Sequence, residues 1–551
     1  MAGFLSAEQI SGKALDHLGL VAATIEKIGL IKKIDKLLPL SKEKGAKTTI
    51  GQRVAAMILN GLGFIDDRLY MFPDFLSNKP VDRLLGEGLH AEDFNDDALG
   101  RGLDKIYGYG CTTLFSQLAF EIGIEQKLLG RSVHIDTSTL SLEGDYEEEA
   151  EEEVFTAQPK HGYSKDHRAD LKQMVINLAT TGAAGFPVWM EAHSGNASDK
   201  KILYECAKKM QSFCKQLKEA PSFLYVADSA IYESCLKEAG ELIWLSRVPG
   251  NHKVAKEMLR QEEENFCWRE LEEGYKICVI ETKYRSVPQR WGIIYSKQAF
   301  DQETTTLNKR ISREYEETKK ALWHLSHKSF GCTKDARKAA HEFSQTLAYH
   351  KIDFSVNETM QHEGRGRPSK GAQPSLRGYQ VTGEIIQDEA KIGPLRNEKG
   401  RFILATNQLD RDILPDAALL STYKEQSKTE SGFRFLKDDT FEVSSIFLKK
   451  PERIAALMMV MTLCLMVYAF AQYGFRRALQ AANDTIPNQL KKATDKPTMK
   501  WVYRLFQGVQ VLTIQLGRKI QEIVINLNET TRKIIGYFGR KALQIYGLES
   551  P

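Results

Sequence analysis

The chain has 551 residues, and at about 150 residues per domain this length predicts roughly three to four domains. Apolar residues make up 42% and charged residues 27%, which excludes wholesale disorder, a collagen-like chain and a coiled-coil rod. The formal net charge of +4 excludes a histone-like polycation, but not an enzyme of nucleic acids whose charge is locally concentrated.

The near-neutral charge is a sum of unlike parts. Residues 441–551 hold 16 Lys and Arg against 7 Asp and Glu, a net charge of +9, so the first 440 residues carry −5. The acidic run at 147–153 is typical of a solvated loop. The basic end of the chain is suited to contact with DNA.

The cysteines and the N-terminus favour a cytoplasmic protein. The eight cysteines are scattered and form no C-x-x-C pair, which disfavours a zinc ribbon and fits a reducing compartment. The N-terminus lacks the pattern of a signal peptide. Residues 454–471 just reach the length of a membrane span, but their Ala and Met content and soluble-type flanks favour a buried helix.

The chain order of the expected elements indicates helices first and an α/β domain next. Residues 1–125 read as short helices, with Asn95 as an N-cap. Strand patterns follow at 132–138, 173–179 and 185–192, the last two as a hairpin, and then at 223–228 and 241–248, with a helix at 199–217. Antiparallel strands followed by parallel ones make a layered α/β domain.

This regularity breaks between 251 and 410. Strands are expected at 290–296 and 402–406, a helix at 316–347 and an exposed Gly/Pro/basic linker at 364–371, which together indicate an insertion. We therefore expect a helical region at 1–125 and the first part of the core at 126–250. The insertion follows at 251–410, the second part of the core at 411–480 and a basic helical C-terminal region at 481–551.

Two aspartates lie where predicted strands end. Carboxylates from adjacent strands, here Asp136 and Asp228, can share divalent cations, and Mg²⁺ prefers such hard oxygen ligands. Two such ions can activate the attacking oxygen and stabilise the leaving one. The alternative for each aspartate is a cap on the following helix.

A third carboxylate comes from a predicted helix at 423–437. Tyr423, Gln426, Glu430 and Lys437 fall at i, i+3, i+7 and i+14 on one stripe, which suits metal coordination beside a phosphate backbone. Glu425 lies off that stripe and is the poorer candidate. The alternative is a solvated face with a Glu430–Arg434 pair.

These residues resemble the DDE transposases of bacterial insertion sequences, in the branch with a Tyr-x2-Arg-x3-Glu-x6-Lys signature (the IS-four superfamily). Tyr423, Glu430 and Lys437 match that signature, and Gln426 stands where the family has Arg. Three further segments look like the same branch, at 60–64, 95–101 and 161–173. The resemblance covers about residues 15–480.

The resemblance implies an α/β RNase H-like catalytic core, interrupted by a mostly β insertion domain, between helical N-terminal and C-terminal regions. It implies Asp136, Asp228 and Glu430 as a catalytic triad that binds two Mg²⁺ ions, with Mn²⁺ as a substitute. It also implies double-stranded DNA as partner, both as the element's terminal inverted repeats and as target, a homodimer in the synaptic complex, cut-and-paste strand transfer, and a nucleoid-associated location without a membrane.

Several further side chains are candidates for DNA contact. Lys165, His167, Arg168 and Lys172 form a basic cluster that suits phosphate binding, with an ordinary charged loop as the alternative. Tyr423, Gln426 and Lys437 join them through the signature. Trp268 and Trp291 fit a buried core better than stacking on a flipped base, and a His134-x-Asp136 metallohydrolase site is disfavoured because no further ligands have matching spacing.

Two other functions stay open: a DNA-binding protein that no longer catalyses, and a structure-specific nuclease on the same fold. Cleavage of DNA that carries the element's ends would argue against the first of these. A preference for particular ends would argue against the second.

Arg365 and Arg367 in an Arg-Gly-Arg-Pro segment resemble an AT-hook core, with a flexible linker as the alternative. If the segment enters an A·T minor groove, Arg367→Ala will weaken binding mainly to A·T-rich flanks, measured by fluorescence anisotropy on matched A·T-rich and G·C-rich duplexes. An equal loss on both duplexes would indicate phosphate contact only.

Overall fold

The computed structural model describes residues 10–40, 46–63, 71–143, 146, 157–218, 221–238, 240–272, 274–362, 371, 373–438, 448–516 and 519–549. The chain forms two compact units, in which residues 245–421 interrupt a first unit made of residues 1–244 and 422–551. We expected an insertion at 251–410. The second unit is longer than this, because it begins 6 residues earlier and ends 11 residues later.

The sheet of the first unit has the order β4-β3-β2-β5-β6. Its strands are β2 (Ser132–Leu142), β3 (Lys172–Thr181), β4 (Phe186–Ser194), β5 (Leu224–Ala227) and the start of β6 (Trp244–Arg247). Strands β2, β3 and β4 are antiparallel, whereas β5 runs parallel to β2. The predicted hairpin is confirmed, and it turns through Gly182, whose φ of 68° favours glycine.

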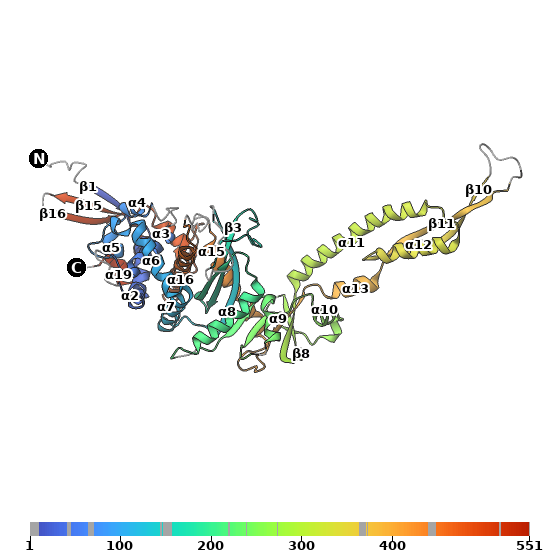
Figure 1. The fold of residues 1–551 in the computed structure, drawn as a ribbon, viewed down its shortest axis with the longest axis horizontal. Helices are drawn as coiled ribbons and strands as arrows, with labels where there is room; N and C mark the ends of the chain where they lie inside the picture. Colours follow the sequence, from blue (N-terminus) through green and yellow to red (C-terminus); the bar gives the residue numbers. More distant parts are fainter. Residues whose placement is uncertain are drawn as a thin grey trace. The chain divides into compact units, whose positions relative to one another are not determined.

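Helices pack against this sheet in the first unit, with α7 against β4 and α8 against β2 and β3 (Figure 1). The N-terminal helices, seven in the described residues, are α1 (Leu18–Lys27), α2 (Leu30–Leu37), α3 (Ile50–Leu62), α4 (Phe72–Ser77), α5 (Val81–Leu85), α6 (Asp96–Tyr109) and α7 (Cys111–Glu125). Asn95 caps α6 as expected, because its side chain accepts a hydrogen bond from Ala98 N. Helices α8 (Asp199–Cys214) and α9 (Ser229–Lys237) follow β4 and β5.

Helix α16 (Pro451–Ala481) is the core helix of the first unit. It packs against α1, α3, α6, α7 and β4, and 89% of its most apolar stretch is buried, although the mean hydropathy of that stretch is 2.4. The interpretation of this segment as a buried helix is confirmed. All eight cysteines, each in the described part of the chain, are free thiols.

The C-terminal region is not purely helical, which corrects the expectation for 481–551. Strand β15 (Gln510–Leu516) pairs with β16 (Lys519–Ile525) on one side and with β1 (Ile10–Ala14) on the other. The Val, Ile and Thr content of these segments favours strands over helices. The other elements there are α17 (Met499–Leu505), α18 (Glu529–Phe538), α19 (Arg540–Ile545), β13 (Ile486–Pro487) and β14 (Ala493–Thr494).

The second unit mixes strands and helices, whereas the sequence suggested a mostly β insertion. Strands β6, β12 (Arg401–Thr406), β9 (Val287–Ser296), β8 (Tyr275–Tyr284) and β7 (Arg269–Glu270) are neighbours in that order. A long hairpin, β10 (His350–Gln361) and β11 (Ser375–Gln387), packs against α11 (Lys297–Ser326) and α12 (Thr333–Thr346) (Figure 1). Helices α10 (Lys253–Leu259) and α13 (Glu389–Asn397) complete the unit.

The helix expected at 316–347 is two helices. Helix α11 begins earlier, at Lys297, and ends at Ser326, and α12 begins at Thr333 after Cys332, whose Sγ accepts a hydrogen bond from Asp335 N. A capping side chain satisfies a backbone donor that a continuous helix would bond internally, so it stabilises a new helix start. Trp291 is 1% exposed and belongs to the core as predicted, and Trp268 is half-buried.

A buried arginine ties strand β9 to the segment after β12. Arg290 is fully buried; its guanidinium pairs with Asp416 at 2.6 Å and donates to Gln408 O at 2.9 Å and Leu414 O at 2.7 Å. Such a charge is stable inside a protein only while its partners stay in place.

Asp416→Ala will therefore lower the free energy of unfolding of the second unit by about 3–5 kcal/mol, because the Arg290 charge loses its counter-ion. Urea unfolding, with limited proteolysis as the readout, measures the change in the free energy of unfolding. Glu317→Ala is the control: it breaks the exposed Arg313–Glu317 pair, 2.8 Å long, and will cost under about 1 kcal/mol. Equal losses in both variants would contradict the role of the buried pair.

Candidate active site

Asp136 and Asp228 lie on neighbouring parallel strands. Strand β2 pairs with β5 so that Ser132 lies beside Leu224 and His134 beside Val226. Continuing this register by two residues places Asp136 opposite Asp228, whose backbone is still extended with φ −67° and ψ −174°. Adjacent strands lie about 4.8 Å apart, so the two carboxylates start from neighbouring backbone positions on one face.

Each aspartate also makes a local hydrogen bond. Asp228 caps α9 by accepting from Ala230 N at 2.9 Å, which is the structural role that the sequence left open. Asp136 accepts from Thr137 N at 2.7 Å. A carboxylate has about four lone-pair sites, so a cap on one oxygen is compatible with metal binding by the same group.

Helix α15 (Ser427–Leu436) covers the face of the sheet that carries Asp136. Leu178 of β3 is the cross-strand partner of Asp136 and so shares its face, and Gly432 of α15 packs on Leu178 so closely that an added Cβ would lie 3.2 Å from Leu178 Cδ2. The Thr429 hydroxyl bonds Thr180 Oγ1 at 2.7 Å and His134 O at 3.3 Å. Glu430, the next residue, is exposed.

The predicted continuous helix at 423–437 is wrong. Helix α14 (Ala418–Lys424) ends before Glu425, and α15 starts after Gln426, so Tyr423 and Glu430 lie on different helices. The short turn uses hydrogen bonds from Gln426 N to Tyr423 O and from Thr429 N to Gln426 O, which span three residues rather than four. Such bonds rotate the chain, so the four-residue stripe is not continuous: Gln426 is buried and Glu430 is exposed.

The donor set of the predicted triad fits a hard divalent cation by type, because all three ligands are carboxylates. Among the described residues, which include all three, no group of three or more His, Cys, Asp and Glu side chains is close enough to hold a metal ion. Asp136 therefore lies on the strand beside β5, which Asp228 follows, and Glu430 lies on the helix that covers the Asp136 face, but the three side chains are not gathered.

The basic loop before β3 runs beside β2. Lys165 Nζ donates to Thr137 O at 2.7 Å and to Thr137 Oγ1 at 3.0 Å, next to Asp136, and Lys165 N donates to Thr139 Oγ1. The signature residue Lys437, at the end of α15, pairs with Asp166 of the same loop at 2.6 Å. The loop thus links the strand of Asp136 to the helix of Glu430.

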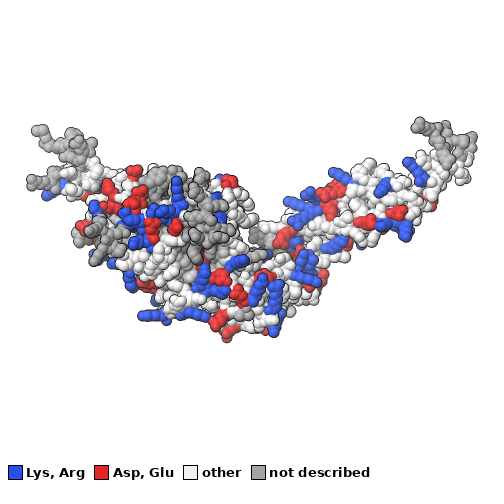
Figure 2. Space-filling model, in the orientation of Figure 1, with Lys and Arg blue, Asp and Glu red and all other residues white. Residues whose placement is uncertain are grey.

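The other predicted DNA contacts are placed differently. Arg168 is exposed and pairs with Asp170 at 2.8 Å, and this pair raises the pKa of Arg168 and lowers that of Asp170. His167 is exposed with a positive φ of 58°, and Lys172 donates to Tyr146 O at 2.6 Å. Arg365, Arg367 and the acidic run lie outside the described residues. Figure 2 shows Lys and Arg interspersed with Asp and Glu on the described part of the visible face.

One interaction near the site was missed from the sequence. Glu425, set aside because it lay off the stripe, places Oε2 3.7 Å from His134 Nε2 and 3.3 Å from Lys428 Nζ. The contact with His134 has the largest effect on Glu425, and it lowers the pKa of that carboxyl below its usual value. Only the helix break, which the residue pattern does not show, brings Glu425 to this position.

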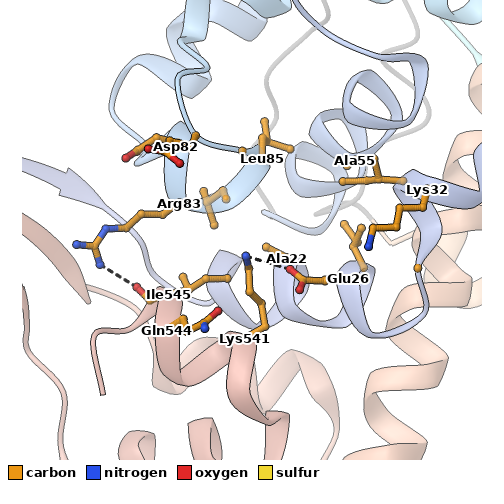
Figure 3. A pocket seen from close by; sticks show the side chains of 16 residues that line it. Ala22, Glu26, Lys32, Ala55, Asp82, Arg83, Leu85, Lys541, Gln544 and Ile545 are labelled. Carbon is orange, nitrogen blue, oxygen red and sulfur yellow. Dashed lines mark hydrogen bonds and ion pairs between the residues drawn. The ribbon is translucent and has the colours of Figure 1, made fainter. Parts of the chain in front are cut away.

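A separate pocket of about 560 Å³ lies between N-terminal helices and α19 (Figure 3). None of the predicted site residues lines it. Its rim holds a Lys541–Glu26 ion pair at 3.0 Å and a hydrogen bond from Arg83 to Ile545 O at 3.0 Å, which both join α19 to the N-terminal helices. These contacts indicate a structural role for the rim.

The comparisons with known proteins identify the family. Residues 133–467 match the transposase DDE domain, and residues 10–120 match a domain of unknown function (DUF4277). Since the first match spans 335 of 551 residues, this chain belongs to the transposase DDE domain family. The protein is therefore a DDE transposase, an enzyme that acts on DNA, and its family generally uses divalent metal ions.

Among solved structures, the chain matches the cryo-EM structure of a piggyBac transposase synaptic complex with hairpin DNA. The two are 11% identical with a TM-score of 0.33, over 90% of this chain and 82% of that chain. No curated protein sequence matches this chain.

The Asp166–Lys437 pair predicts competition with DNA. If Lys437 binds a backbone phosphate, Asp166→Asn will tighten binding to short duplexes at low salt by about two- to fivefold, because Lys437 then has no ion pair with Asp166 to lose. Fluorescence anisotropy against salt concentration measures both the affinity and a steeper salt dependence. Glu241→Gln is the matched control: it frees Lys215 near the amino end of β5, the end opposite Asp228. Unchanged or weaker binding by Asp166→Asn would contradict the competition.

Proposed function

We propose that this transposase binds the terminal inverted repeats of its own bacterial insertion sequence, in the IS-four branch, and catalyses cleavage and strand transfer of the cut-and-paste type. The parallel pairing of β2 with β5 chiefly supports this proposal, because its last pair, His134 and Val226, lies two residues before Asp136 and Asp228. The position of α15, which carries Glu430, over the same sheet supports it further. All three residues fall within the part of the chain that matches the transposase DDE domain.

Asp136, Asp228 and Glu430 are the proposed ligands of two Mg²⁺ ions, which Mn²⁺ can replace. Carboxylate oxygens suit both cations. When bound, such ions lower the pKa of water to make a nucleophile at neutral pH and stabilise the charge that develops at phosphorus. The two aspartates are held by strand backbone, so their spacing changes little during the reaction, whereas Glu430 depends on how α15 packs.

The residues around the carboxylates position the DNA strand. Lys437 exchanges Asp166 for a backbone phosphate, and Lys165 supplies positive charge beside Thr137, close to the scissile bond. His167 and Arg168 are exposed on the same loop and extend this contact. Tyr423 and Gln426 support the start of α15, where Gln426 is buried.

We further propose that the sheet of the first unit is an RNase H-like core and that the second unit is its insertion domain. Both element ends must be held at once for strand transfer, so the working complex is a homodimer on two DNA ends, with target DNA bound next. The site of action is the cytoplasm, at the nucleoid.

Asp136→Asn tests the assignment. It will lower the rate of end cleavage at least about a thousandfold, because a metal site contributes several kcal/mol to such a reaction, while binding of end DNA is retained. Gel assays on labelled end-containing DNA in Mg²⁺ and in Mn²⁺ measure both properties. Asp74→Asn, at an exposed position of α4, is the control and will cleave at the normal rate. Normal cleavage by Asp136→Asn would contradict the assignment of the catalytic triad.

A further inference from the structure

The helix that carries Glu430 begins at Ser427, six residues after the end of the second unit. That unit ends at Ser421, and the break at Glu425 and Gln426 separates α14 from α15. Because the break interrupts the helical hydrogen bonds, the direction of α15 is not set by α14. Side-chain contacts at the start of α15 therefore help to fix it against the sheet, together with the packing of Gly432 on Leu178 and Leu465.

Glu425 makes such a contact through two partners. Its Oε2 lies 3.7 Å from His134 Nε2, and His134 is 1% exposed on β2, two residues before Asp136 and on the same face. The same carboxylate oxygen lies 3.3 Å from Lys428 Nζ, which donates to Gly182 O at the β3–β4 turn with a distance of 3.2 Å. One carboxylate thus joins the start of α15 to the strand of Asp136 and, through Lys428, to the neighbouring hairpin.

The surroundings of His134 strengthen this link. Its ring nitrogen Nε2 lies 3.1 Å from Ser132 Oγ, and its carbonyl oxygen accepts from the Thr429 hydroxyl of α15. A buried ring can move little, so it is a rigid anchor for Glu425. Glu430 follows Glu425 by five residues, and a rotation of the first turn of α15 would move both side chains together.

We propose that Glu425 is a positioning residue of the transposase active site, which holds the first turn of α15 against β2 and so sets where Glu430 stands relative to Asp136. The inference rests on the proposed metal site formed by Asp136, Asp228 and Glu430. It separates the two glutamates by role: Glu430 binds metal, whereas Glu425 acts only through the protein.

Glu425→Gln tests the proposal, because the amide keeps the size of the side chain and removes its charge. The affinity of the full-length protein for Mn²⁺ without DNA will fall about 10- to 100-fold, as expected when a group that orients a metal ligand is lost. Electron paramagnetic resonance measures this affinity. The Mn²⁺ concentration for half-maximal end cleavage will rise by a similar factor. Affinity for end DNA will stay within about twofold, and Glu425→Asp will restore part of the metal affinity.

Glu522→Gln is the matched control. Glu522 is also a partly exposed carboxylate of the first unit, 36% exposed against 42% for Glu425, and it pairs with Arg83 at 2.6 Å. The Glu522→Gln substitution will leave the Mn²⁺ affinity unchanged, even if it changes the melting temperature. If Glu425→Gln fails to fold, Lys428→Met, which breaks the other half of the contact, carries the same measurements.

The outcomes separate this inference from the proposed function. Normal Mn²⁺ affinity in Glu425→Gln, with Asp136→Asn inactive, would overturn the positioning role and leave the triad standing. Weak Mn²⁺ binding in both Glu425→Gln and Asp136→Asn supports both assignments. Full activity and Mn²⁺ binding in Asp136→Asn would remove the metal site, and with it the role of Glu425.

Discussion

The packing of α16 is the constraint on which the first unit depends. This 31-residue helix is apolar on nearly all sides, so it is stable only when other elements surround it. It contacts four N-terminal helices, strand β4 and α15, and each fully buried apolar side chain contributes about 1.5–3 kcal/mol. Leu465 of α16 and Leu178 of the sheet enclose Gly432 between them. A larger side chain at that position would push the helix of Glu430 away from the sheet.

Much of the fold of the first unit could be predicted because its signals are local. Alternating apolar residues marked β2, a glycine-containing turn marked the β3–β4 hairpin, and a short apolar run that ends in Asp228 marked the parallel strand β5. The sheet that joins β1 to β15 could not be predicted. Its strands come from opposite ends of the chain, and no local pattern reports a partner so far away.

The candidate site shows the same division. Residue type and signature spacing made Asp136, Asp228 and Glu430 candidates, because both are visible in one dimension. The expected strand end at Asp136 is wrong, because β2 continues to Leu142. The contacts of Glu425 with His134 and of Asp166 with Lys437 depend on a helix break and on the path of a loop. Both are set by tertiary packing, which overrides helical periodicity.

The pairing of β1 with β15 has a consequence for synthesis of the protein. Ile10 pairs with Ile514, and these two paired residues lie 504 positions apart along the chain. At about 5–20 residues per second a ribosome needs roughly 25–100 s to make that stretch. The N-terminal helices also cannot complete their packing until α16 has been synthesised. Until then their apolar faces are exposed to solvent or to chaperones. The first unit is therefore completed late in the synthesis of each chain. The enzyme cannot act before that point.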